Sequence, residues 1–146
     1  MKKISALLTL MLGALMLSGT AFAAEANERH EKMTMGAFEH KAVDNGVRAE
    51  FQIMSLASMN MKDPDGATHH VMVKLFHDSM KHPIKNAVGK VKIIKPDGKE
   101  QTNSLKNYNG IFAANFTFGE NDKYGVICLV IVDGEKHIFK FWYPHE

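Results

Sequence analysis

Cysteine is almost absent from this 146-residue chain, and its scarcity limits how the fold can be held together. The only cysteine is Cys128, in the apolar run YGVICLVIV, so no disulfide can form within the chain. The fold must therefore rest on the packing of apolar side chains. A single thiol among β-branched residues predicts a small buried apolar group rather than a reactive thiolate. The chain also lacks a CxxCH motif, which excludes covalent haem attachment by that pattern.

An excess of positive charge is missing from the part of the chain that is expected to fold. The sequence has 18 Lys and Arg residues against 16 Asp and Glu residues. Lys2 and Lys3 lie in an N-terminal signal-like segment, and without them the basic and acidic residues are equal in number. Binding of nucleic acid through phosphate contacts requires a basic face. We therefore expect no nucleic-acid partner.

Residues 1–23 have the features of a secretory signal peptide. Two lysines precede a short apolar run, and Ala21, Phe22 and Ala23 supply the small residues of a cleavage site. Because the apolar run is short and the cleavage pattern follows at once, removal on export is favoured over a retained membrane anchor. We expect a soluble periplasmic protein with no permanent anchor after cleavage.

The remaining chain is predicted to form one domain behind a leader. Residues 24–36, AEANERHEKMTMG, are charged and lack an apolar period, which predicts a flexible leader. Residues 37–146 have the length of a single domain with one core.

Long apolar stripes at helical spacing are missing after residue 36, whereas strand signals recur at short intervals. AFEHKAV and VRAEFQIM flank Asp44-Asn45-Gly46, residues that tolerate positive φ, and are expected to form a hairpin. In the second strand the residues expected on one face are Val47, Ala49, Phe51 and Ile53. Those expected on the other face are Arg48, Glu50, Gln52 and Met54.

Further strands are predicted in THHVMVKLFH, near residues 89–94, in GIFAANFTFG, and in KYGVICLVIV followed by HIFKFWY. The stretch after Pro96-Asp97-Gly98, as far as Asn109, is polar and predicts no strand. About seven short strands with frequent turns favour an all-β fold, an antiparallel β-sandwich. The unbroken apolar run 126–132 predicts a central strand covered on both faces.

Methionine is distributed unevenly along the chain. The methionines that follow the signal all precede residue 81: Met33, Met35, Met54, Met59, Met61, Met72 and Met80. Residues that merely fill gaps would also occur in the C-terminal strands, so the asymmetry indicates a role in function. Thioethers are soft ligands suited to Cu(I) and need no deprotonation, and imidazole adds affinity for Cu(II) and Zn(II). Outside the cytoplasm this mixture points to copper, as Cu(I).

Strand geometry selects among these ligands. His69 and His70 project to opposite faces of a strand, whereas His70 and Met72 share one face. Met54 emerges on the corresponding face of the preceding strand, and the connecting loop carries two more methionines. The predicted metal ligands are Met54, Met59, Met61, His70 and Met72. Two alternatives remain open: these methionines fill gaps in the core, and His69 is a core histidine bonded to a backbone carbonyl.

A second candidate cluster lies in HDSMKHP, where a bend before Pro83 would turn His77, Met80 and His82 toward one point. The alternative is a solvated loop. Nearby lysines at 74, 81 and 85 would repel a cation, which makes this the weaker metal site.

Two stretches carry a family resemblance: THHVMVKLFHDSMKHPIKNAVGKVKIIKPDGK and NGIFAANFTFGENDKYGVICLVIVDGEKHIFKFWY. With a Pro-Ile-x-Asn-Ala connection, a strand ending in Pro-Asp-Gly and a closing hairpin, the chain resembles the YtkA-like and FixH-like family of small exported domains. The resemblance implies an immunoglobulin-like β-sandwich and a setting near copper handling, oxidase assembly or metal efflux. It supplies no ligand set, because the family has no uniform one.

Motifs for catalysis are missing: there is no Gly-x-Ser-x-Gly elbow, no phosphate-binding glycine loop and no His-Glu-x-x-His pair. We therefore expect a protein that is not an enzyme.

The leading hypothesis is a periplasmic copper-binding carrier, buffer or resistance factor that exchanges the ion with an envelope partner. The alternative is a non-metal interaction or assembly module of the bacterial envelope, in which the methionines form an adaptable contact surface. Non-covalent haem held by His and Met is a third possibility, but it requires an apolar slot.

Overall fold

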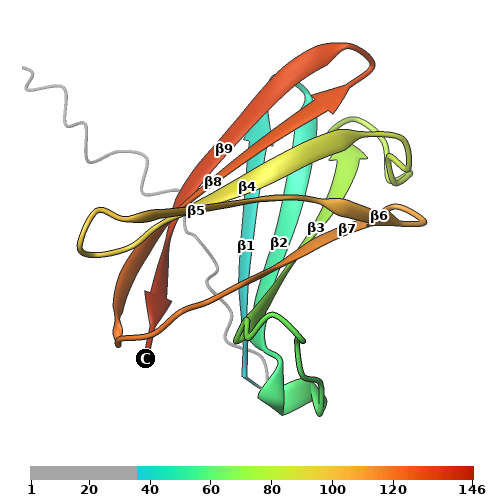
Figure 1. Ribbon diagram of the computed structural model, residues 1–146. Coiled ribbons are helices and arrows are strands. Elements are labelled where there is room, and N and C mark those ends of the chain that lie inside the picture. Colours follow the sequence, from blue (N-terminus) through green and yellow to red (C-terminus); the bar gives the residue numbers. More distant parts are fainter. Residues whose placement is uncertain (1–35) are drawn as a thin grey trace, which may run out of the picture.

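The computed structural model describes residues 36–146 as two antiparallel β-sheets packed face to face (Figure 1). Sheet A contains, in spatial order, β1 (Ala37–Asp44), β2 (Val47–Ser55), β3 (His69–His77), β7 (Ile111–Phe116) and β6 (Lys106–Tyr108). Sheet B contains β5 (Glu100–Ser104), β4 (Val88–Ile94), β8 (Asp122–Val132) and β9 (Glu135–His145). A short 3-10 helix, η1 (Ala57–Met59), follows β2. The predicted all-β sandwich is confirmed, with nine strands in place of about seven.

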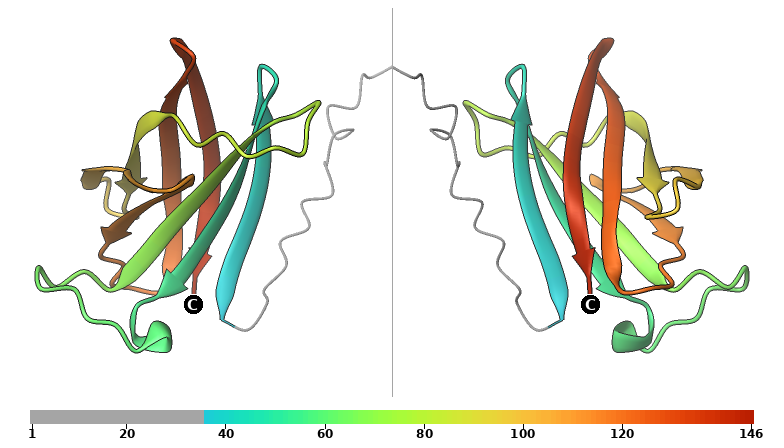
Figure 2. Two further views of the ribbon diagram at one scale, coloured as in Figure 1. Left: turned by 90° about the vertical axis from the view of Figure 1, so that its right-hand side faces the viewer. Right: turned by 90° about the vertical axis from the view of Figure 1, so that its left-hand side faces the viewer.

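The strand order follows the immunoglobulin pattern. Without β1, sheet A has the order of immunoglobulin strands A, B, E and D, and sheet B has the order C′, C, F and G. β1 extends sheet A beyond β2 through a tight hairpin, in which Asn45 and Gly46 have φ of 46° and 78°. Figure 2 shows the two layers edge-on, with β1 beside β9 where the sheets approach each other.

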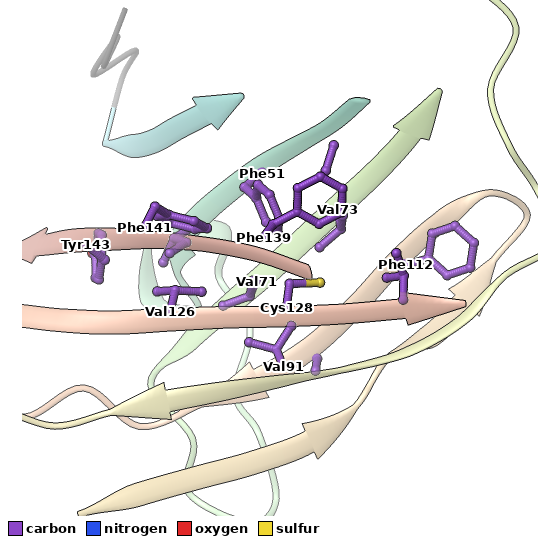
Figure 3. Packing of buried hydrophobic residues seen from close by; sticks show 14 of the residues in the cluster. Phe51, Val71, Val73, Val91, Phe112, Val126, Cys128, Phe139, Phe141 and Tyr143 are labelled. Atoms are coloured by element: carbon purple, nitrogen blue, oxygen red, sulfur yellow. The ribbon is translucent and has the colours of Figure 1, made fainter. Parts of the chain in front are cut away.

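Inward-facing side chains from both sheets form one core (Figure 3). Phe51 and Val73 of sheet A meet Val91 and Cys128 of sheet B, and all four are almost completely buried. The predicted alternation in β2 and β3 is therefore confirmed, since every second residue there faces the core. Cys128 is the expected buried apolar group, and burial raises the pKa of its thiol to about 12.

Two strands, β5 and β6, lie in the polar stretch that predicted none. Their side chains are mostly exposed on both faces, so they show no alternation of apolar and polar residues. Between them, Leu105 packs against the core and its backbone N–H donates to the carbonyl of Gly89 at 2.9 Å. The chain passes from sheet B to sheet A at this point, and each sheet gains a polar edge strand, which discourages pairing with other chains.

The expectation that both faces of the 126–132 strand are covered is wrong. β8 is an inner strand of sheet B, and its inward residues are buried. Its outward residues Ile127 and Leu129 are only half-buried, and Ile131 is 39% exposed. The run is apolar on both sides, but among residues 36–146 no third layer lies over this sheet.

The predicted signal peptide, residues 1–23, lies outside the described residues, as does the predicted leader 24–36 except for Gly36. Within the described range, no helix has the length and apolar character needed to cross a membrane.

Candidate metal centre

Three of the five predicted ligands share the outer face of sheet A. Antiparallel pairing of β2 with β3 places Met54 directly opposite His70, and Met72 follows two residues along β3. Side chains that are directly opposite in such a pair have Cβ atoms about 4.5–5.5 Å apart, and diagonal neighbours are about 7–8 Å apart. Met54, His70 and Met72 are therefore neighbours on one half-buried patch, which we call the Met-His face.

The loop between β2 and β3 carries the other two predicted ligands. The ends of the loop are joined by a hydrogen bond from the Leu56 N–H to the Thr68 carbonyl at 2.9 Å. Within the loop, the Met61 N–H donates to the Leu56 carbonyl, also at 2.9 Å. Met61 is 50% exposed and lines the same cavity as His70. Met59 is half-buried in η1 and does not line that cavity. The structure thus brings Met61 toward the Met-His face more directly than Met59.

This cavity, of about 480 Å³, lies between the β2–β3 loop and strands β5, β6 and β7. Polar side chains dominate its wall, among them Asp63 and Asn115 beside His70. A second hollow of about 140 Å³ lies next to Met72, with Glu39 and Glu50 in its lining together with lysines 41 and 74. The Met-His face therefore lies between two open hollows.

The imidazole of His70 is oriented by a chain of hydrogen bonds. Nδ1 of His70 lies 2.6 Å from Oδ1 of Asn115, whose Nδ2 donates to Oδ1 of Asp63 at 3.5 Å. Asp63 is itself held in place because its Oδ2 accepts the N–H of Ala67 at 3.0 Å. An ionised carboxylate only accepts, so the amide of Asn115 turns its NH₂ to Asp63 and its oxygen to His70. This network assigns the proton of His70 to Nδ1 and leaves the lone pair on Nε2.

Such an arrangement is typical of histidines that bind metals. A metal-binding imidazole usually donates its other N–H to an oxygen acceptor, which fixes the tautomer and makes the ligand nitrogen more basic. Asn115 and Asp63 would have this role for His70. Neither residue could be predicted from the sequence as part of the site, because β7 and the loop meet β3 only in the folded chain.

The alternative that the methionines fill the core is wrong for those that the structure describes. No methionine belongs to the buried core of residues 36–146. Met54, Met59 and Met72 are half-buried, while Met61 and Met80 are each 50% exposed. Met33 and Met35 lie outside the described residues. The described methionines are thus at least partly exposed to solvent.

His69 faces the core, as its position next to His70 predicts. Its Nδ1 lies 2.8 Å from the hydroxyl oxygen of Thr68, so its partner is a side chain rather than the expected backbone carbonyl. The ring makes edge contacts with Phe118 and His145, each at a centroid distance of 4.9 Å. Burial, and secondarily the charge of His145, lowers the pKa of His69 to about 4. His69 therefore stays neutral near pH 7.

The second predicted cluster lies in the loop that follows β3. His77 ends the strand, and its carbonyl accepts the N–H of Met80 at 3.0 Å. A bridge between Phe76 and Pro83 closes the loop, and Met80 and His82 are exposed. These contacts fix the bend that the sequence predicts, while convergence of the three side chains on one ion stays a prediction.

Within residues 36–146, no group of three or more His, Cys, Asp and Glu side chains is arranged to hold a metal ion. Two of the three groups on the Met-His face are thioethers, which belong to none of these four residue types.

Comparison with known proteins identifies no relative: no protein-family model matches the chain, and no curated protein or solved structure matches significantly. The resemblance to YtkA-like and FixH-like domains therefore stays a prediction.

Proposed function

We propose that this protein binds copper as Cu(I) on the Met-His face and acts in the periplasm as a carrier, buffer or resistance factor. The observation that supports this most is the hydrogen bond between His70 and Asn115, which leaves the lone pair of Nε2 free for a metal on a face that also carries Met54 and Met72. Two thioethers and one imidazole form an uncharged, soft set of ligands, which Cu(I) prefers over harder cations. Met54, Met72 and His70 are the ligands in this proposal.

Transfer of the ion would proceed by ligand exchange. The three ligands are half-buried, so a partner with its own thioethers or imidazoles can approach without unfolding the sandwich. Met61 is the proposed fourth ligand, because it lies in the loop two residues after η1 and lines the same cavity as His70. No bond in a substrate is made or broken, so the proposed role is not enzymatic.

The rival function is a non-metal interaction or assembly module that uses the same methionines as an adaptable contact surface. Such a surface needs accessible thioethers, but its contact with a partner would not depend on an imidazole held in one tautomer. The hydrogen-bond chain from His70 through Asn115 to Asp63 therefore favours metal binding.

Anaerobic titration with Cu(I) against a chromophoric competing chelator tests the proposal, with Cu(II) and Zn(II) for comparison. Met54→Leu and Met72→Leu keep the side-chain volume nearly constant, so they remove sulfur with little effect on packing. We expect each to weaken Cu(I) binding at least tenfold, while Ile138→Leu, a change of similar volume on the outer face of sheet B, leaves it unchanged. The same stoichiometry and affinity in the Met54→Leu/Met72→Leu double variant would exclude the Met-His face as the site.

A further inference from the structure

The outer face of sheet B combines an apolar column with lysines on both sides. The column consists of Ile127, Leu129 and Ile131 of β8. Its neighbours on β4 are Val88, Lys90, Lys92 and Ile94, and those on β9 are Lys136, Ile138, Lys140 and Trp142. Val88 is 66% exposed and Trp142 is 60% exposed, so the surface is open. We call these eleven residues the Lys-apolar face.

The six-membered ring of Trp142 lies close to Gly125 on this face. Gly125 lies opposite Trp142 in the pairing of β8 with β9. A Cβ atom added to Gly125 would lie 3.6 Å from Cζ3 of Trp142 and 3.4 Å from Cβ of Ile94. The glycine thus leaves room for the indole to lie over the sheet.

The charge of this face is largely uncompensated. Lys92 pairs with Glu100 of the adjacent edge strand at 3.1 Å. Lys90, Lys136 and Lys140 form no ion pair with any residue in the range 36–146. An acidic ligand would meet three unpaired ammonium groups around apolar side chains.

The spacing of the lysines fits one kind of secondary structure. β4 and β9 lie on either side of β8, and neighbouring strands are about 4.8 Å apart, so the two lysine-bearing strands are separated by about 10 Å. An α-helix with its side chains is about 10–12 Å wide. Residues 125–131 extend about 20 Å along the strand, the length of about 14 helical residues.

We propose that the Lys-apolar face binds an amphipathic α-helix of another protein. Its apolar stripe lies on the β8 column, and acidic residues on both flanks pair with the lysines of β4 and β9. A second copy of this chain fits poorly, because two such faces would oppose lysines with lysines. A flat lipid surface gives no reason for lysines on both sides of the apolar column. The proposal is independent of metal binding, since it concerns the opposite sheet.

Trp142 is the only tryptophan in the chain, so its fluorescence reports directly on this face. The probe is a synthetic 14-residue helical peptide with a leucine stripe flanked by glutamates, and the matched control carries lysines in place of the glutamates. We expect the acidic peptide to give a saturable blue shift of the Trp142 emission that weakens as salt is added. The lysine peptide should give none.

Charge reversal localises the binding. Lys90→Glu with Lys140→Glu should weaken binding of the acidic peptide at least tenfold, whereas Lys41→Glu with Lys85→Glu makes the same change in net charge elsewhere and should not. Equal weakening in both variants would overturn the proposed site.

Absence of a shift with the acidic peptide, or an equal shift with the lysine peptide, overturns the helix proposal. If phosphatidylglycerol vesicles shift the emission and the acidic peptide does not, the face binds membranes instead. A blue shift that depends on protein concentration alone would indicate a second copy.

Discussion

The outer faces of the two sheets differ although their inner faces are alike. On β1 and β2 of sheet A several charged side chains have partners: Lys41 lies 3.5 Å and Arg48 lies 3.3 Å from the carboxylate of Glu50, and Glu39 accepts a hydrogen bond from Gln52 at 2.9 Å. On sheet B the corresponding positions are lysines and large apolar residues, with one ion pair among them.

This difference shows that the inward side chains are constrained by the fold, whereas the outward side chains can vary between the two sheets. A sandwich is stabilised by its inward side chains, which bury apolar area at about 25 cal/mol per Å². The outward side chains contribute little to that term, so they are free to differ. Sheet A has the Met-His face, for which we propose a soft metal ion, and sheet B has the Lys-apolar face, for which we propose a protein partner.

The largest expected effect comes from comparing two single variants, one with an aspartate on the inner face of β8 and one with an aspartate on its outer face. Val126 is completely buried, so Val126→Asp leaves an unpaired charge in the core and should cost at least about 4 kcal/mol of unfolding free energy. Ile127, its neighbour on the outer face, should tolerate the same change for about 1 kcal/mol. Urea denaturation measures both. Similar losses in the two variants would contradict the division of roles between inner and outer faces.

Removal of the Asn115 side chain should affect metal binding more than folding. Asn115→Ala frees Nδ1 of His70 and allows the other tautomer, which should weaken Cu(I) binding about 10–100-fold. Nitrogen NMR of the His70 ring would report the change of tautomer directly. Asn103→Ala is the matched control, because Asn103 bonds only the backbone carbonyl of Asn115, at 2.7 Å. An unchanged affinity in Asn115→Ala would remove the hydrogen-bond chain from the site.

His69, on the inner face of β3, should make the stability of the protein depend on pH. The pKa of His69 is about 4 in the folded protein and about 6.5 when the chain is unfolded, so only the unfolded state takes up a proton between these values. Stability should therefore be complete above pH 6.5 and fall as the pH decreases to 4. One pKa unit is worth about 1.4 kcal/mol, and partial solvent access reduces the expected loss to about 1–2 kcal/mol.

The measurement is the unfolding free energy against pH, with a chelator present to remove metal. His69→Phe keeps an aromatic ring against Phe118 and Tyr143 but cannot titrate, so its stability should depend less on pH over this range. The same dependence in the variant and the natural sequence would assign the effect to other groups.

The smallest effect is expected from the paired charges on sheet A. Lys41 is largely exposed, and exposed ion pairs contribute little because water screens them. Lys41→Ala should change the unfolding free energy by less than about 0.5 kcal/mol, as measured by urea denaturation. A loss above 1 kcal/mol would mean that the charge network of sheet A has a structural role.

Most of the fold could be predicted from local sequence patterns. Alternation identified β2 and β3 with the correct faces, and the Asn45-Gly46 turn identified the first hairpin. β5 and β6 were missed because an edge strand with two solvated faces shows no alternation. The cover predicted for β8 was wrong, because an apolar run does not reveal how many layers a fold has.

The candidate site was only partly predictable. Period-2 spacing placed His70 and Met72 on one face, and the neighbouring strand placed Met54 beside them. Asn115 lies 45 residues after His70 in the chain, and no local pattern connects the two. The positions of Met59 and Met61 depend on how the β2–β3 loop folds, which strand periodicity does not describe.

By itself, the sequence determined the all-β class, the inward sets of side chains and the concentration of methionine before residue 81, because these follow from residue type and from the two-residue repeat of a strand. Only the tertiary structure decided that His70 meets Asn115 and that lysines from two strands flank the apolar column of β8. Pairing between strands that are distant in sequence is set by the global packing of both sheets, and it brings together side chains that no local rule relates.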